Sequence, residues 1–269
     1  MQPLSAWPLS VRSRIDVLLS DIDDTMTRDG KLPAESYRAM WDLSDAGVAV
    51  IPVTGRPAGW CDLICRQWPV AGVIGENGAF VFTMDGKRLE KIYHPSAPDP
   101  SVNRDRLSEI AAEVYREIPG TRPAKDQFSR LFDVAIDFRE EPPLLGYEVA
   151  NAIKAIFERH GAQAKVSSIH VNAWYGSYDK RSMAHHFLAA RFGIDVDAEP
   201  ENLRAVFCGD SPNDEPMFAA FRNSIGVANI APFAGGLTHG PAYLTRGESA
   251  DGFVEVARAI LDAKPQKPA

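Results

Sequence analysis

Short apolar runs alternate with amphipathic segments along the first 75 residues of the chain. The runs at 15–20, 48–53 and 71–75 are apolar at successive positions, which is typical of strands covered on both faces of a parallel sheet. The segments between them, 35–47 and 58–68, have the spacing of amphipathic helices. This order predicts a βαβαβ unit.

The same alternation returns near the carboxyl end of the chain. Strand-like runs at 204–209, 223–228 and 242–245 alternate with helical segments near 213–221 and 252–262. Strands that alternate with helices favour a parallel sheet with helices on both faces. We therefore expect an α/β fold with a doubly wound, mostly parallel sheet and a Rossmann-like core.

The middle of the chain has a different sequence pattern. A hairpin is predicted to turn at residues 85–86, and the segment 94–100 that follows contains three prolines, which indicates a linker. Beyond the linker, the predicted elements are a helix at 102–118, a strand at 131–138, a helix at 144–160 and a strand at 165–174. We therefore expect an inserted α+β cap domain at 97–175 between two parts of the core, 1–96 and 176–269.

The composition argues against several classes of protein. With 29 Lys and Arg against 36 Asp and Glu, the formal net charge is −7, which disfavours general binding to nucleic acid. Apolar residues at 45% and charged residues at 24% are typical of a globular chain, and only the tail at 264–269 is expected to fray. No apolar run approaches the ~18 residues of a spanning helix, and the amino-terminal segment is a poor secretory signal. We expect a cytoplasmic protein that does not cross the membrane.

Polar side chains follow the predicted strands at the points where these strands end. Asp21 and Asp23 follow the first strand, and Thr54 follows the second. Asp210 follows the strand at 204–209. Each residue alone is typical of a turn or a helix cap. Because ligands bind outside the carboxyl ends of strands in an open parallel sheet, we expect these side chains to converge on one site.

The residue types at this predicted site suit a metal-bound phosphate. Asp21 and Asp23 would repel each other unless a cation lay between them or one carboxyl kept its proton. Carboxylates are the hard oxygen ligands that Mg²⁺ prefers, whereas a hydroxyl and the ammonium of Lys180 can donate to phosphoryl oxygens. An activated carboxylate can also act as a nucleophile. Lys180 opens a predicted helix, where a lysine is normally solvated, so the residues alone leave both interpretations open.

Four short motifs carry a resemblance to a known family. DIDDT at 21–25, VTGR at 53–56, Lys180 and GDSPND at 209–214 resemble, in this order, the motifs of the haloacid dehalogenase superfamily. GENGA at 75–79 and the long insertion after the second motif look like the subgroup with an α/β cap. That subgroup includes Cof-type sugar-phosphate phosphatases and the sucrose-phosphate and mannosyl-phosphoglycerate phosphatases.

The resemblance implies a role for each core residue. Asp21 would attack phosphorus, and Asp23 would protonate the leaving group and then activate water. Thr54 and Lys180 would hold the phosphoryl oxygens. Mg²⁺ would be bound by Asp21, by the backbone carbonyl of Asp23 and by Asp210.

Other residues are candidates for supporting this chemistry. By the resemblance, Asp214 would support the metal or Lys180. His170, Asn172 and Trp174 alternate with apolar residues on a predicted strand, so their face is either a solvated edge or a specificity surface. The candidate substrate-binding residues are Arg56, Asn77 and Asn213 in the core and Arg122, Lys125 and Asn172 in the cap.

The expected function is therefore hydrolysis of a phosphomonoester. The resemblance implies an Mg²⁺-dependent phosphatase that acts on a small phosphorylated metabolite, most readily a sugar phosphate, through an aspartyl-phosphate intermediate. A large cap would exclude bulky substrates such as proteins. A phosphomutase with the same nucleophile and a catalytically silent binding protein are the alternatives. A dehalogenase is disfavoured, because it would not use Asp23. The sequence sets neither the substrate nor the oligomeric state.

Overall fold

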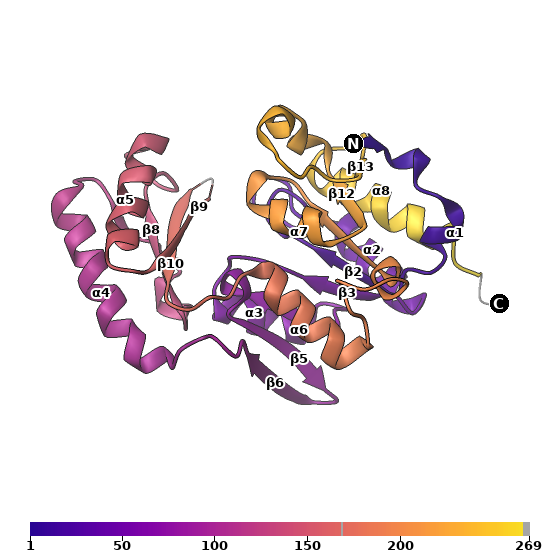
Figure 1. The fold of residues 1–269 in the computed structure, drawn as a ribbon, viewed down its shortest axis with the longest axis horizontal. Helices are drawn as coiled ribbons and strands as arrows, with labels where there is room; N and C mark the ends of the chain where they lie inside the picture. Colours follow the sequence, from indigo (N-terminus) through magenta and orange to yellow (C-terminus); the bar gives the residue numbers. More distant parts are fainter. Residues whose placement is uncertain (168, 266–269) are drawn as a thin grey trace.

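A six-stranded parallel sheet forms the centre of the larger of two lobes in the computed structural model, which describes residues 1–167 and 169–265 (Figure 1). Its strand order is β1–β13–β12–β11–β2–β3. The strands are Gln2–Pro3 (β1), Val17–Ser20 (β2), Ala49–Pro52 (β3), Ala205–Gly209 (β11), Asn223–Gly226 (β12) and Tyr243–Leu244 (β13). The predicted doubly wound α/β fold is confirmed, with β1 as an additional short edge strand. Most of the tail at 264–269 lies outside the described residues.

Helices cover both faces of this sheet. Leu18 and Val206 point into one hydrophobic cluster with helices α2, α3 and α8, whereas Leu19 and Phe207 point into a second cluster with α6 and α7. The helices are Ala34–Asp45 (α2), Ala58–Gln67 (α3), Lys180–Phe192 (α6), Glu215–Ala220 (α7) and Ser249–Leu261 (α8), with the short Leu9–Arg12 (α1) before β2. Because both faces are buried, apolar residues are needed at successive strand positions, as the sequence has them.

A separate three-stranded sheet follows the second helix of the βαβαβ unit. Its strands, Val73–Gly75 (β4), Phe80–Asp85 (β5) and Arg88–Tyr93 (β6), are antiparallel. The run at 71–75, expected to continue the parallel sheet, instead touches it through a single bridge between Val53 and Ile74. The chain reverses immediately after β4, so β4 pairs with β5. The hairpin turn predicted at 85–86 is present, since Asp85 pairs with Arg88.

The smaller lobe is built from the inserted part of the chain (Figure 1). Its antiparallel sheet has the order β7–β8–β10–β9. The elements are Pro100–Glu117 (α4), Arg122–Pro123 (β7), Asp133–Asp137 (β8), Tyr147–Arg159 (α5), Gln163–Val166 (β9) and His170–Trp174 (β10). The single strand predicted at 165–174 is wrong. The backbone N–H of Ser167 donates to the carbonyl oxygen of His170, and the backbone N–H of His170 donates to the hydroxyl of Ser167, so the chain turns here. Ser168, inside that turn, lies outside the described residues.

The two faces of the cap sheet differ in polarity. Val134, Ile136 and Val171 pack with α4 and α5 on one face. His170 and Asn172 belong to the other face and line a cavity shared with the larger lobe. The domain boundaries at 96/97 and 175/176 stay a prediction. Among the described residues, no helix is both long and apolar enough to span a bilayer.

Candidate active site

The carboxyl ends of β2, β3 and β11 lie side by side in the larger lobe. The register pairs Ser20 with Pro52 on one side and with Cys208 on the other. The backbone N–H of Asp21 donates to the carbonyl oxygen of Cys208 at 2.9 Å. The residues that follow these strands therefore meet at one edge of the sheet, although up to 189 positions separate them in sequence.

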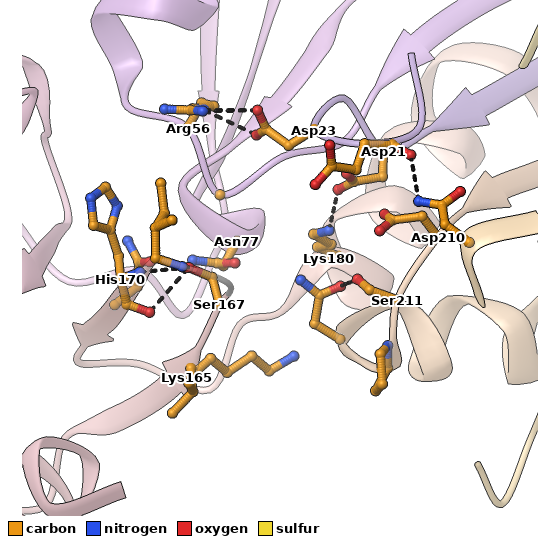
Figure 2. Close-up of a pocket in the computed structure, with 18 of the residues that line it drawn as sticks. Asp21, Asp23, Arg56, Asn77, Lys165, Ser167, His170, Lys180, Asp210 and Ser211 are labelled. Carbon is orange, nitrogen blue, oxygen red and sulfur yellow. Dashed lines mark hydrogen bonds and ion pairs between the residues drawn. The ribbon is translucent and has the colours of Figure 1, made fainter. Parts of the chain in front are cut away.

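A buried lysine joins two carboxylates at this edge. The Nζ atom of Lys180 donates to Oδ1 of Asp21 at 2.6 Å (Figure 2) and to Oδ1 of Asp214 at 2.9 Å. Only 5% of Lys180 is exposed, so its usual solvated state is excluded. Burial lowers the pKa of Lys180, but the two carboxylates raise it by more, so the net shift is upward. The ammonium therefore stays charged among anions.

The start of helix α6 fixes the position of Lys180. Asp179 caps the helix by accepting a hydrogen bond from the backbone N–H of Ser182 at 2.7 Å. Gly78 has a φ of +105°, and a Cβ there would lie 2.1 Å from the carbonyl oxygen of Asp179. The GENGA turn and the start of α6 are therefore packed backbone to backbone, which requires glycine at residue 78.

Asp210 and Asp214 lie behind Asp21 on the turn after β11. Oδ1 of Asp210 accepts a hydrogen bond from the Thr25 hydroxyl at 3.1 Å. Oδ2 of Asp214 accepts one from the backbone N–H of Asp210 at 3.2 Å. A Cβ at Gly209 would lie 2.5 Å from that Asp214 oxygen, so glycine is needed for this close approach. Asp214 is fully buried and accepts hydrogen bonds from both the Asp210 backbone and the Lys180 ammonium, so it fixes the positions of both residues.

The local charge balance fits a divalent cation. Carboxylate oxygens of Asp21, Asp210 and Asp214 lie within 4.8 Å of one another. Burial, together with the neighbouring carboxylates, raises the pKa of Asp21 to about 7. Burial, Asp21 and Asp214 raise the pKa of Asp210 to about 9. Burial is the largest cause of both pKa shifts, and repulsion between the carboxylates adds to it, so a cation bound here would stabilise their charged forms. Hard oxygen donors of this kind are those that Mg²⁺ prefers.

The side chain of Asp23 points away from this cluster and toward Arg56 (Figure 2). The guanidinium of Arg56 donates from Nε to Oδ2 at 3.0 Å and from Nη2 to Oδ1 at 2.8 Å. It also lies over the ring of Trp60, 4.4 Å from the centroid. Arg56 therefore orients Asp23 as well as lining the cavity.

The other core candidates are differently placed. Thr54 is buried at the end of β3, where its Oγ1 accepts the backbone N–H of Arg56 at 3.0 Å, and it is not among the described residues lining the cavity. Asn77, with a φ of +58°, lines the cavity. Asn213 also lines it, with Oδ1 accepting the hydroxyl of Ser211 at 3.0 Å.

A cavity of about 610 Å³ opens in front of Asp21, between the two lobes. Its core wall carries Asp21, Asp23 and Asp210. Residues of the cap complete the enclosure opposite them (Figure 2). The cap residues that line it are Arg130, Tyr147, Lys165, Val166, Ser167, Ile169, His170 and Asn172. The cap wall therefore faces Asp21 across the cavity and narrows the approach to it.

Two of the cap candidates lie elsewhere. Nε of Arg122 donates to Asp137 at 2.7 Å, and Lys125 is exposed, 3.7 Å from Glu141; neither is among the described residues lining the cavity. The basic residue of that stretch that does line it is Arg130. The local sequence cannot show which of Arg122, Lys125 and Arg130 faces the cavity. The register of the cap sheet and the ion pair between Arg122 and Asp137 decide this.

The polar face of β10 is not a solvated edge, because β10 lies between β8 and β9 and His170 and Asn172 are buried. Nδ2 of Asn172 donates to Asp133 at 2.9 Å, and Nε2 of His170 lies 2.8 Å from Glu140. Lys165, which the sequence reasoning missed, stands opposite Asn172 in the register. Recognising a hairpin at Ser167 would have placed Lys165 on the same face.

A series of ion pairs connects the core to the cap. Arg56 Nη1 lies 4.0 Å from Oδ2 of Asp126, whose Oδ1 accepts from Nε of Arg130 at 3.1 Å. Nη1 of Arg130 reaches the carbonyl of Gly55 at 3.1 Å and Oδ1 of Asp133 at 2.9 Å. Through Asp133, this network continues to Asn172 on the cavity wall. Asp23 and the cap surface thus belong to one hydrogen-bonded assembly.

A parallel sheet with acidic side chains at its strand ends, facing an inserted second lobe, defines a two-lobed α/β protein with a candidate site between the lobes. Residues 18–103 match the haloacid dehalogenase-like hydrolase family. The match includes the first two of the four motifs, so this part of the chain is similar to that family in sequence. No curated protein sequence matches the chain.

Solved structures with this fold cover nearly the whole chain. A Thermoplasma acidophilum protein is 17% identical, with a TM-score of 0.70 over 91% of this chain and 98% of its own. The C-terminal domain of C. albicans trehalose-6-phosphate phosphatase is 15% identical, with a TM-score of 0.71 over 94% and 96%. Sucrose-phosphatase from Synechocystis sp. PCC6803 is 17% identical, with a TM-score of 0.62 over 91% and 97%. At these identities the similarity concerns the fold.

Proposed function

We propose that the protein is an Mg²⁺-dependent phosphomonoesterase that hydrolyses a small phosphorylated metabolite of the sugar-phosphate kind through an aspartyl-phosphate. The observation that carries this proposal is the buried Lys180 ammonium held between Asp21 and Asp214, next to Asp210, at the core wall of the cavity between the lobes. An anionic cluster with a fixed ammonium suits a metal-bound phosphoryl group better than a neutral ligand. Two of the structural neighbours are named as sugar-phosphate phosphatases, which favours this substrate class.

In the proposed reaction, Asp21 is the nucleophile. Its carboxylate faces the cavity, and Lys180 is positioned to balance charge on the phosphoryl oxygens. Asp21, Asp210 and the backbone carbonyl of Asp23 would hold Mg²⁺, which would offset phosphate charge. Thr54 would donate its hydroxyl proton to a phosphoryl oxygen, since its Oγ1 already accepts the backbone N–H of Arg56. Because Thr54 is not among the described residues that line the cavity, this role requires the phosphoryl group to reach the end of β3.

Asp23 is proposed to move the protons. It would donate a proton to the leaving oxygen while Asp21 bonds to phosphorus, and would then take a proton from the water that releases phosphate. The ion pair with Arg56 places its carboxylate at the wall of the cavity, beside the route to the leaving group. The same residue can therefore serve both half-reactions.

A phosphate-release assay with p-nitrophenyl phosphate and a panel of sugar phosphates tests the proposed function. A hydrolase should release orthophosphate with Mg²⁺ alone. Release that depends on a bisphosphate activator would instead indicate a phosphomutase. Binding of sugar phosphates without turnover of any ester would indicate a catalytically silent binding protein.

Metal removal should abolish this activity. We expect EDTA to stop turnover, Mg²⁺ to restore it, and Ca²⁺ to inhibit, because Ca²⁺ takes six to eight ligands and would draw the nucleophile into its shell. Since the pKa values of Asp21 and Asp210 are raised to about 7 and about 9, protons compete with the metal. Mg²⁺ affinity should therefore increase as the pH rises from 6 to 9. Binding of Mg²⁺ should also release protons, which calorimetric titrations in two buffers of different ionisation enthalpy would measure. Activity that survives EDTA would refute the metal assignment.

Arg56→Met should impair proton transfer selectively. Losing a bidentate, charge-assisted pair should free the Asp23 carboxylate and lower kcat/KM for an alkyl phosphate by roughly 10- to 100-fold. The loss should be smaller for p-nitrophenyl phosphate, whose leaving group needs little protonation. Arg66→Met, which removes an exposed ion pair with Asp62 on α3, is the matched control. Equal losses on both esters would mean that Arg56 does not act through Asp23.

A further inference from the structure

One cation on the wall of the cavity has no ion-pair partner among the described residues. The described basic side chains lining the cavity are Arg56, Arg130, Lys165 and Lys180. Arg56 is paired with Asp23, Arg130 with Asp133, and Lys180 with Asp21. Within residues 1–167 and 169–265, the Lys165 ammonium makes no hydrogen bond or ion pair.

The position of Lys165 makes this free charge unusual. The residue is half-buried on β9, and its side chain extends from the cap wall toward the core side of the cavity (Figure 2). Burial and the charge of Lys180 lower its pKa, which shows that the surroundings oppose an unpaired ammonium there. Charges removed from water are normally paired, so a half-buried lysine without an ion-pair partner in a cavity favours an anionic ligand.

The cap wall around Lys165 is built from donors and neutral groups. Among the described cap residues that line the cavity there is no carboxylate, whereas Asp21, Asp23, Asp24 and Asp210 line it from the core. Asn172 is the cross-strand neighbour of Lys165, and Ser167 lies two positions further along the chain. The cap side of the cavity thus offers one free positive charge, flanked by hydroxyl and amide groups.

We propose that the substrate carries a second anionic group, a carboxylate or a second phosphate, and that Lys165 binds this group while the phosphoryl ester faces Asp21. This inference rests on the proposed phosphatase function and narrows its substrate class from neutral sugar phosphates to phosphorylated acids or bisphosphates. A neutral sugar would leave the Lys165 ammonium enclosed without a partner. An anionic group would give Lys165 a charge-assisted hydrogen bond and would restore its ordinary ionisation.

Matched pairs of esters test this proposal. Glucuronic acid 1-phosphate differs from glucose 1-phosphate, and 3-phosphoglycerate from glycerol 3-phosphate, only in a carboxylate that replaces a hydroxymethyl group. Fructose 1,6-bisphosphate compared with fructose 1-phosphate tests a second phosphate. We expect kcat/KM to be at least about 10-fold higher for the doubly anionic member of one type of pair, as a charge-assisted hydrogen bond would give. The type of pair that shows the preference identifies the second anionic group as a carboxylate or a phosphate.

Variants of Lys165 connect the preference to this side chain. Lys165→Met should remove the preference and leave kcat/KM for p-nitrophenyl phosphate within about 2-fold of the wild type, and Lys165→Arg should keep the preference. Lys87→Met, at an exposed lysine in the β5–β6 turn, is the matched control and should change neither.

Three outcomes would overturn the inference. The wild type could turn over both members of every pair equally, or Lys165→Met could keep the preference. Alternatively, Lys165→Met could slow p-nitrophenyl phosphate as strongly as the acids, which would place Lys165 on the transferred phosphoryl group. Failure of the proposed function is distinguishable, because the wild-type protein would then hydrolyse none of these esters, including p-nitrophenyl phosphate.

Discussion

Asp21→Asn is expected to reduce phosphatase turnover by roughly 10⁴-fold or more, as is typical when a nucleophile is removed. The amide has the shape of the carboxylate but cannot attack phosphorus. Lys180 keeps its second partner, Asp214, at 2.9 Å, so the fold around the site should persist. Thermal unfolding of the variant checks this.

Asp23→Asn should fail at a different step. Without a group to move protons, turnover should fall by about 10²–10⁴-fold. With p-nitrophenyl phosphate, whose leaving group departs unaided, this variant should still be phosphorylated but should lose phosphate slowly. Intact-mass measurement after a rapid quench should show one added phosphoryl group on Asp23→Asn and none on Asp21→Asn. Near-native turnover by Asp21→Asn, or phosphate mapped to a histidine, would rule out the aspartyl-phosphate mechanism.

Glu76→Leu should destabilise the protein by about 3–5 kcal/mol, because unsatisfied buried donors cost about 1–3 kcal/mol each. The buried Glu76 carboxylate accepts four backbone N–H groups at 2.6–3.2 Å, from the start of α3 and from the cap segment before β8. The donors are those of Ala58, Leu131, Phe132 and Asp133. Leucine has a similar size but accepts none of these bonds.

Urea unfolding followed by tryptophan fluorescence measures this effect. Glu109→Leu, at an exposed position on α4, is the control for replacing a glutamate and should change stability little. If Glu76→Leu lowers the free energy of unfolding by less than about 1 kcal/mol, water has replaced the carboxylate as the acceptor for the four backbone N–H groups. The GENGA turn would then have a smaller structural role than its contacts indicate.

The core could be read from the sequence because its signals are local. Strands β2 and β11 are apolar at successive positions, and the structure buries both of their faces. The convergence of Asp21 and Asp210 followed from topology alone, since the carboxyl ends of parallel strands share one edge. To predict these features, it is enough to know the direction of the strands and which strands are neighbours in the sheet.

The features that the sequence did not predict depend on long-range partners. Lys180 has the sequence setting of a surface residue, and only Asp21 and Asp214, far away in the chain, make it a buried ammonium. Glu76 is part of the GENGA motif, and nothing in that motif shows that its carboxylate accepts hydrogen bonds from the backbone of two other segments. Lys165 was missed because its orientation depends on the register between β9 and β10.

The ion-pair network between Arg56, Asp126, Arg130 and Asp133 has a consequence for how such a protein can diversify. Positive and negative groups alternate along it, so losing one member leaves a neighbour with an unbalanced charge in a poorly solvated place. A cap inherited from a relative would need a carboxylate where Asp126 meets Arg56 of the core. The cap is thus not a freely exchangeable module, and new substrate preferences can arise more readily on strands β9 and β10 than by replacing the whole insertion.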